Sequence, residues 1–168
     1  MSKEEEQSRV LARYTEGPER LEQTVAGLDE SDLDARVSPN GWTVRQVVHH
    51  IVDGDDVWKL SIKTALGLDD GEFTLGWYWS QSQDSWAEKW KYSARSVDVS
   101  LALFRANRDH ILQLLQHVPD GWQRSVRLET PDGKTERVTV GTAIQIQADH
   151  AMHHIEQIVG VVGTRGGG

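Results

Sequence analysis

The residues of this chain with the clearest potential for chemistry are its histidines. Seven are present, and five of them lie in two clusters, His49-His50 and the trio His150, His153 and His154. The chain contains no cysteine, which excludes disulfides, thiolate ligands and a cysteine nucleophile. Imidazole and carboxylate groups therefore make up its ligand repertoire, and two clusters of imidazoles indicate a possible metal site.

The later cluster has the spacing of two ligands on one helix face. His150 and His154 are four residues apart, so their Cβ atoms lie about 5–6 Å apart in a helix. From there two imidazoles can reach one ion through bonds of about 2.0–2.1 Å. His153 falls with Asp149 and Glu156 on the opposite face, which is predicted to be solvated. The spacing alone is a weak signal, and no glutamate follows the first histidine as in the HExxH proteases.

The earlier cluster offers one more ligand. On a helical wheel His50 falls beside Gly54 and Trp58, whereas His49 falls with polar and acidic residues on a side predicted to be solvated. A glycine inside a helix costs about 1 kcal/mol, so Gly54 indicates either space for an ion and substrate or close helix packing. The predicted metal ligands are His50, His150 and His154.

No catalytic residue is assigned beyond these ligands. Asp53 and Asp55 lie near His50 in the sequence and are candidates for a general base. Most helical aspartates are solvated, however, so the catalytic residues stay unknown at this level.

Four blocks of helical periodicity must position these side chains. They span about residues 4–26, 43–66, 96–118 and 141–163. The first is predicted to break near Gly17-Pro18, because proline fits the first turn of a helix and not its interior. The second opens on Thr43 with Gln46 three residues later, which is the pattern of a capping box, and Gly67 can end it.

The segments between the helices complete the predicted fold. Residues 69–83 are predicted to form a loop, in which Trp77 and Trp79 are expected to be exposed. Residues 122–140 alternate polar and apolar side chains around the turn sequence 130–133, which predicts a β-hairpin. The expected fold is all-α, a four-helix bundle with a small β-hairpin between the third and fourth long helices. Residues 1–163 are predicted to form one domain and residues 164–168 a flexible tail.

The composition narrows the class of function. The chain has 168 residues and a formal net charge of −8, which argues against nucleic acid as a partner. No apolar run reaches the roughly 18 residues of a membrane helix, and the acidic start is unlike a signal peptide. We therefore expect a cytoplasmic protein that acts on small molecules or binds protein partners.

Two segments carry a family resemblance. Residues 41–53 read GWTVRQVVHHIVD and residues 149–158 read DHAMHHIEQI, and both resemble the DinB/YfiT-like superfamily. The resemblance implies a helical bundle in which three histidines bind one divalent ion, zinc or nickel first and manganese or iron as alternatives. One ligand is the second histidine of the pair and two come from the last helix, which again gives His50, His150 and His154.

The resemblance also implies several activities. Members are described as metal-dependent hydrolases and as bacillithiol S-transferases, so we expect transfer of a low-molecular-weight thiol to an electrophilic small molecule. Hydrolysis of an amide or ester is one alternative, and a non-enzymatic, metal-binding, stress-associated dimer is another. A homodimer is expected from the resemblance and from the seven tryptophans. Residues 53–58, DGDDVW, and the loop with Trp77 and Trp79 depart from the family pattern, which leaves the substrate open.

Overall fold

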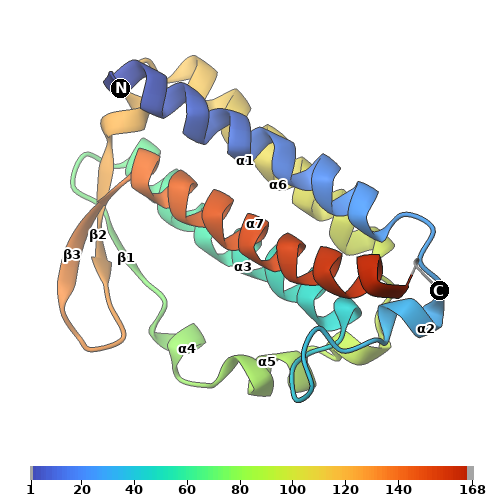
Figure 1. Ribbon diagram of the computed structural model, residues 1–168. Coiled ribbons are helices and arrows are strands. Elements are labelled where there is room, and N and C mark those ends of the chain that lie inside the picture. The colour runs from blue at the N-terminus through green and yellow to red at the C-terminus, as the bar shows by residue number, and fades with distance from the viewer. Residues whose placement is uncertain (1, 166–168) are drawn as a thin grey trace.

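A bundle of four long helices makes up most of the molecule (Figure 1). The computed structural model describes residues 2–165. The long helices are α1 (Lys3–Val25), α3 (Val44–Gly67), α6 (Asp98–His117) and α7 (Val140–Arg165). Helices α1 and α3 each pack against both α6 and α7. The predicted all-α four-helix bundle is confirmed. Among the described residues, no helix has the length and apolar character needed to cross a bilayer.

Helix α3, which carries the first histidine pair, begins where the sequence predicted. The Thr43 hydroxyl accepts a hydrogen bond from the amide of Gln46 at 3.2 Å, and the Gln46 side chain accepts one from the amide of Thr43 at 2.9 Å. These reciprocal bonds satisfy two amides that have no partner within the helix. They fix the start of α3 at Val44, five residues before His49, and hence the register of the histidines.

The break predicted near Gly17-Pro18 is wrong, because α1 continues through Pro18. Proline has no N–H, so the carbonyl of Tyr14, four residues earlier, loses its helical partner. The Arg108 side chain of α6 donates to this carbonyl from Nη1 at 2.7 Å. Gly17 provides the space, since a Cβ there would lie 2.4 Å from Arg108 Nη1. A buried arginine thus supplies the donor that proline lacks.

The predicted hairpin is present and gains a third strand. Strands β2 (Ser125–Glu129) and β3 (Thr135–Thr139) pair antiparallel around a turn in which Gly133 has a φ of +77°. Strand β1 (Glu72–Thr74) pairs parallel to β2, with Phe73 opposite Leu128. The segment 69–83 is therefore not only a loop, because it holds β1 and helix α4 (Gly76–Trp79). A strand of three residues is too short for a recognisable alternation of polar and apolar residues in the sequence. It forms here because the backbone of β2 pairs with it.

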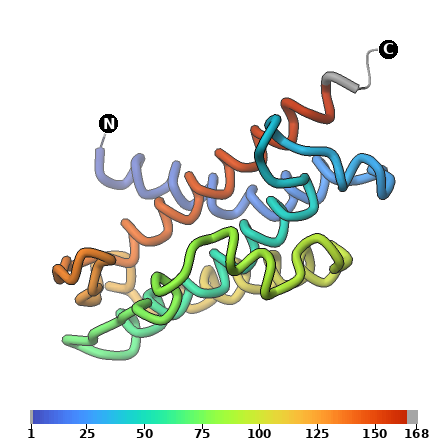
Figure 2. Tube along the Cα trace, turned by 90° about the horizontal axis from the view of Figure 1, so that it is seen from below, coloured from blue at the N-terminus to red at the C-terminus, as the bar shows by residue number. Residues whose placement is uncertain are grey.

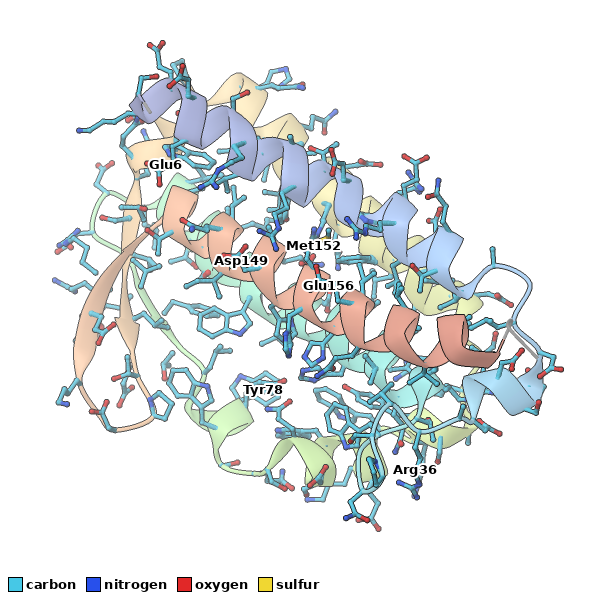
Figure 3. The ribbon with its side chains drawn as sticks, in the orientation of Figure 1. Glu6, Arg36, Tyr78, Asp149, Met152 and Glu156 are labelled. Atoms are coloured by element: carbon cyan, nitrogen blue, oxygen red, sulfur yellow. The ribbon has the colours of Figure 1, made fainter. Side chains whose placement is uncertain are left out.

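Helices α4 and α5 (Gln83–Lys89) lie along one side of the bundle, next to α3 (Figure 2). Tyr78 and Trp86 stack with ring centroids 5.9 Å apart, and Trp86 donates from Nε1 to the backbone carbonyl of Tyr78 at 2.8 Å. Figure 3 places Tyr78 between α4 and the bundle. These aromatic side chains form a small core of their own with Val57 of α3. The aromatic segment is thus fixed against the bundle.

The remaining elements are short connections. They are α2 (Glu30–Leu33) and two 3₁₀ turns, Tyr92–Ala94 and Gly121–Gln123. Helix α7 continues past the predicted domain end at residue 163 and reaches Arg165. Residues 166–168 of the predicted flexible tail lie outside the described residues.

Candidate metal centre

The structure brings the three predicted ligands together between α3 and α7. One ring nitrogen from each of His50, His150 and His154 lies within 4.8 Å of the others, and the Nε2 atoms of His50 and His150 are 3.0 Å apart. The three ring centroids are separated by 4.6–4.9 Å. Because α3 and α7 pack directly, a residue on one flank of α3 faces two residues one turn apart on α7. Their role as metal ligands stays a prediction.

The protonation state of the cluster suits metal binding. Burial first, and then the neighbouring His150 and His154, lower the pKa of His50 to about 3. Burial also lowers the pKa of His150 to about 4, and it lowers the pKa of His154. All three imidazoles are therefore neutral near pH 7. Neutral imidazole is the form that donates a lone pair to a metal ion.

A glutamine one turn further along α7 orients His154. The Nδ1 atom of His154 lies 2.8 Å from Oε1 of Gln157, and the Gln157 amide nitrogen lies 3.2 Å from Nε2 of His153. An amide oxygen only accepts hydrogen bonds, so Nδ1 of His154 carries the proton and Nε2 keeps its lone pair. Gln157 is not among the site residues predicted from the sequence; its spacing of three residues from His154 was the available signal.

Replacing Gln157 with leucine should weaken divalent-metal binding about ten- to a hundredfold, because partners that orient a ligating histidine contribute that much to affinity. The measurement is a competition titration against a chromophoric chelator. Gln145→Leu, at an exposed position of the same helix, is the matched control and should bind metal like the parent protein. Equal affinities for the two variants would contradict the orienting role.

The other two clustered histidines differ in environment. His153 is exposed, as predicted. His49 was predicted to be solvated, and this is wrong because its exposed fraction is 0%. Its Nδ1 lies 2.9 Å from the Ser100 hydroxyl and its Nε2 lies 3.3 Å from the carbonyl of Arg95. Helix α6 and the preceding turn cover that side of α3, which the pattern of α3 alone could not reveal.

Both candidate bases are held in ion pairs. Asp55 is 3% exposed, and its Oδ1 accepts hydrogen bonds from Nε and Nη2 of Arg108 at 3.2 and 3.0 Å. Asp53 lies 3.5 Å from the Arg95 guanidinium. The Asp55 pair crosses the bundle and joins α3 to α6, so it has a structural role. No general base is assigned by this geometry.

A cavity of about 260 Å³ opens beside the centre. His50 and His150 form part of its wall, and Trp58, Tyr78 and Trp79 form an aromatic wall. Gly54 also lines it, and a Cβ there would lie 3.6 Å from Cε1 of His150, which is ordinary van der Waals contact. Of the two explanations for Gly54, space and close helix packing, the structure favours space, and a methyl group would fit there. Trp77 and Trp79 differ, since Trp77 is 54% exposed and Trp79 is half-buried.

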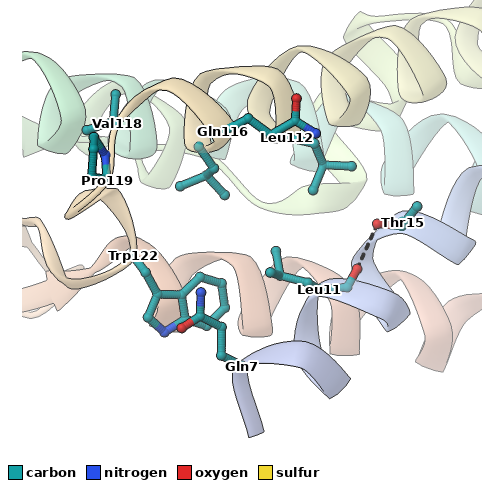
Figure 4. A pocket seen from close by; sticks show the side chains of 9 residues that line it. Gln7, Leu11, Thr15, Leu112, Gln116, Val118, Pro119 and Trp122 are labelled. Carbon is teal, nitrogen blue, oxygen red and sulfur yellow. Dashed lines mark hydrogen bonds between the residues drawn. The ribbon is translucent and has the colours of Figure 1, made fainter. Parts of the chain in front are cut away.

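A larger cavity of about 390 Å³ lies between α1, α6 and the turn that holds Trp122 (Figure 4). Its wall includes Leu11, Leu112 and Pro119, and the described residues that line it carry no ionisable side chain. This cavity therefore lacks histidine and carboxylate ligands and groups that could transfer a proton near pH 7, and the histidine centre is the better candidate for chemistry.

Fold and site together define a helical-bundle protein with a three-histidine centre on two neighbouring helices. The family model of the DinB superfamily matches residues 13–158, so the chain belongs to the DinB superfamily. This confirms the resemblance seen in the two histidine segments.

Individual relatives agree with this assignment. The chain is 28% identical to a proposed metal-dependent hydrolase of Oceanobacillus iheyensis, over 84% of this chain and 77% of that protein. It is 30% identical to another of Bacillus mycoides, over 84% of this chain and 76% of that protein. Its structure is similar to YfiT from Bacillus subtilis, described as a probable metal-dependent hydrolase with an unusual four-helix bundle topology. The TM-score is 0.81 at 27% identity, over 99% of this chain and 90% of YfiT.

Proposed function

We propose that this protein is a metal-dependent hydrolase of a small molecule, with one divalent ion held by His50, His150 and His154. The observation that carries the proposal is the convergence of three neutral imidazoles at the wall of a cavity. Among the described residues, this cluster includes no fourth histidine, aspartate or glutamate. Three protein ligands with an open position are typical of catalytic sites, whereas structural sites are closed. The names of the relatives support the same activity.

The chain's own residues provide binding and orientation. A divalent ion held at such a site supplies Lewis acidity and lowers the pKa of a water or thiol. The buried imidazoles stay neutral, Gln157 holds the tautomer of His154, and aromatic side chains line the cavity beside the centre. Imidazole ligands suit zinc, nickel and iron, and we propose zinc or nickel, with manganese or iron as alternatives. Elemental analysis of protein purified without a metal-affinity column identifies the ion.

Transfer of a low-molecular-weight thiol to an electrophile is the alternative reaction at the same centre. Its support is the family resemblance together with the absence of cysteine, since the protein has no thiol of its own for an electrophile to alkylate. The names of the relatives favour hydrolysis instead. A third possibility is an ion that only stabilises a non-enzymatic protein.

The test compares these activities in one preparation. Metal-loaded protein is incubated with a panel of aryl esters and anilides, and separately with monochlorobimane plus bacillithiol, mycothiol, glutathione or cysteine. We expect metal-dependent hydrolysis that is lost in His150→Ala. Thiol conjugation above the His150→Ala control, without hydrolysis, would replace our proposal by the transferase. If neither reaction occurs and metal removal only lowers thermal stability, the structural role is correct.

We also propose a cytoplasmic homodimer. Exposed apolar side chains such as Leu68, Trp77 and Val99 support association. The tryptophan count supports it less than expected. All seven tryptophans are in the described part, Trp77 alone is more than half exposed, and several of the others pack within one chain. Sedimentation at tens of micromolar should give twice the chain mass; a monomer mass would contradict the dimer.

A further inference from the structure

We infer that the cavity beside the three histidines binds a small, uncharged aromatic group that carries an N–H donor. The inference deepens the proposed function, since it assigns this group to the substrate. It rests on the walls of the cavity, on two buried oxygen atoms and on the charge of the lining.

The walls of the cavity favour a flat ring. Trp58 comes from α3, and Tyr78 and Trp79 come from α4. Tyr78 is held by its stack on Trp86 and by the hydrogen bond from Trp86 to its backbone carbonyl. Aromatic side chains bind other rings in stacked or edge-to-face arrangements. The volume of about 260 Å³ is below the roughly 300–1,000 Å³ of sites for drug-sized ligands, so one or two fused rings are the expected size.

Two buried oxygen atoms in the lining residues need a donor. Asp55 and Gln147 both line the cavity and are 3% and 5% exposed. Oδ1 of Asp55 accepts from Arg108, but its Oδ2 has no hydrogen-bond partner among residues 2–165. Likewise Oε1 of Gln147 has none in the described part of the chain. A buried acceptor without a donor is unfavourable, so a ligand that supplies an N–H gains affinity there.

The side-chain donors of Gln147 and of its neighbour in the lining, Tyr78, are already used. Nε2 of Gln147 donates to the backbone carbonyl of Asp55 at 3.1 Å, and the Tyr78 hydroxyl donates to Oε1 of Gln83 at 2.8 Å. Gln147 and Asp55 therefore complement a ligand that donates, and they do not complement one that accepts.

The charge of the lining favours a neutral group. Asp55 is the acidic residue among the described lining residues, and Arg108 neutralises it at 3.0 Å. A divalent ion held by His50 and His150 of the wall would also repel an ammonium group. An uncharged aromatic N–H, as in indole or an aryl amide, fits all three observations.

The experiment uses indole as the probe, with 1-methylindole, which lacks the donor, and 3-methylindole, which keeps it at the same size. Binding to the full chain is measured by titration calorimetry, with and without zinc. We expect indole and 3-methylindole to bind about three- to tenfold more tightly than 1-methylindole, which is the net effect of one hydrogen bond. Equal affinities for the three probes, or no binding of any, would overturn the inference.

Two variants test whether Gln147 is responsible for the preference for probes with an N–H donor. Gln147→Met removes the acceptor of Gln147 at similar size and should reduce the preference for N–H probes, with Oδ2 of Asp55 still able to accept. Gln147→Glu keeps an acceptor and should retain the preference, so it serves if Gln147→Met does not fold. An unchanged preference for N–H probes in folded Gln147→Met, or the loss of that preference in Gln147→Glu, counts against the assignment.

The inference and the proposed function can fail separately. Absence of metal binding would refute the proposed function alone, because the probes are also tested on metal-free protein. Metal-dependent hydrolysis without the preference for N–H probes would refute this inference alone.

Discussion

Replacing His50, His150 or His154 with alanine should each weaken divalent-metal binding by more than about a hundredfold. Each substitution removes one of three converging nitrogen donors, and no other histidine, aspartate or glutamate of the described residues belongs to the group whose ligand atoms converge within 4.8 Å. The expected loss exceeds the ten- to hundredfold effect of removing a partner that only orients a ligand. The measurements are titration calorimetry and elemental analysis of each purified variant.

His153→Ala is the matched control for these variants. It lies on the same helix, next to His154, and it is exposed. It should bind metal with little change, apart from a small effect through its contact with Gln157. His49 is unsuitable as a control, because its side chain is fully buried against Ser100 and its loss would disturb the packing of α3 on α6. Retention of parental affinity by any single ligand variant would remove that histidine from the site.

Replacing Arg108 with methionine should lower the free energy of unfolding by about 3–5 kcal/mol, the usual result of removing one partner of a buried ion pair. The side chain is 1% exposed and donates to Asp55, to the carbonyl of Tyr14 and to the carbonyl of Gln147. Its loss leaves the Asp55 carboxylate buried without a counter-charge. For a chain of this length the melting temperature should fall by roughly 6–20 °C. Urea unfolding followed by circular dichroism measures the change.

Arg105→Met provides the comparison, since Arg105 lies on the same helix and pairs with Glu22 at the surface. Exposed pairs contribute about 0.2–1 kcal/mol, so this variant should unfold nearly like the parent. Adding Pro18→Ala to Arg108→Met should restore part of the stability, because residue 18 then has an amide that can donate to Tyr14. Similar losses for Arg108→Met and Arg105→Met would show that the buried pair does not stabilise the fold.

The sequence by itself determined the elements that depend on near neighbours. The capping box at Thr43 and Gln46 forms within one helical turn, so its start signal is local and the structure confirms it. The four-residue spacing of His150 and His154 determines that they share a face of α7. The turn with Gly133 needs a positive φ, which glycine adopts readily, so the hairpin was predictable as well.

Only the tertiary structure decided which helix faces are covered by other helices and which side chains replace a missing backbone hydrogen bond. His49 is buried because α6 packs on its side of α3, and helix periodicity does not specify which polar side another helix will cover. Pro18 is tolerated because Arg108, 90 residues away in the sequence, donates to the carbonyl that proline leaves free. Strand β1 forms on the edge of β2, and the cavity exists because α4 folds back beside α3. Each of these outcomes depends on groups that are distant in the sequence and meet only when the bundle assembles, so local patterns could not specify them.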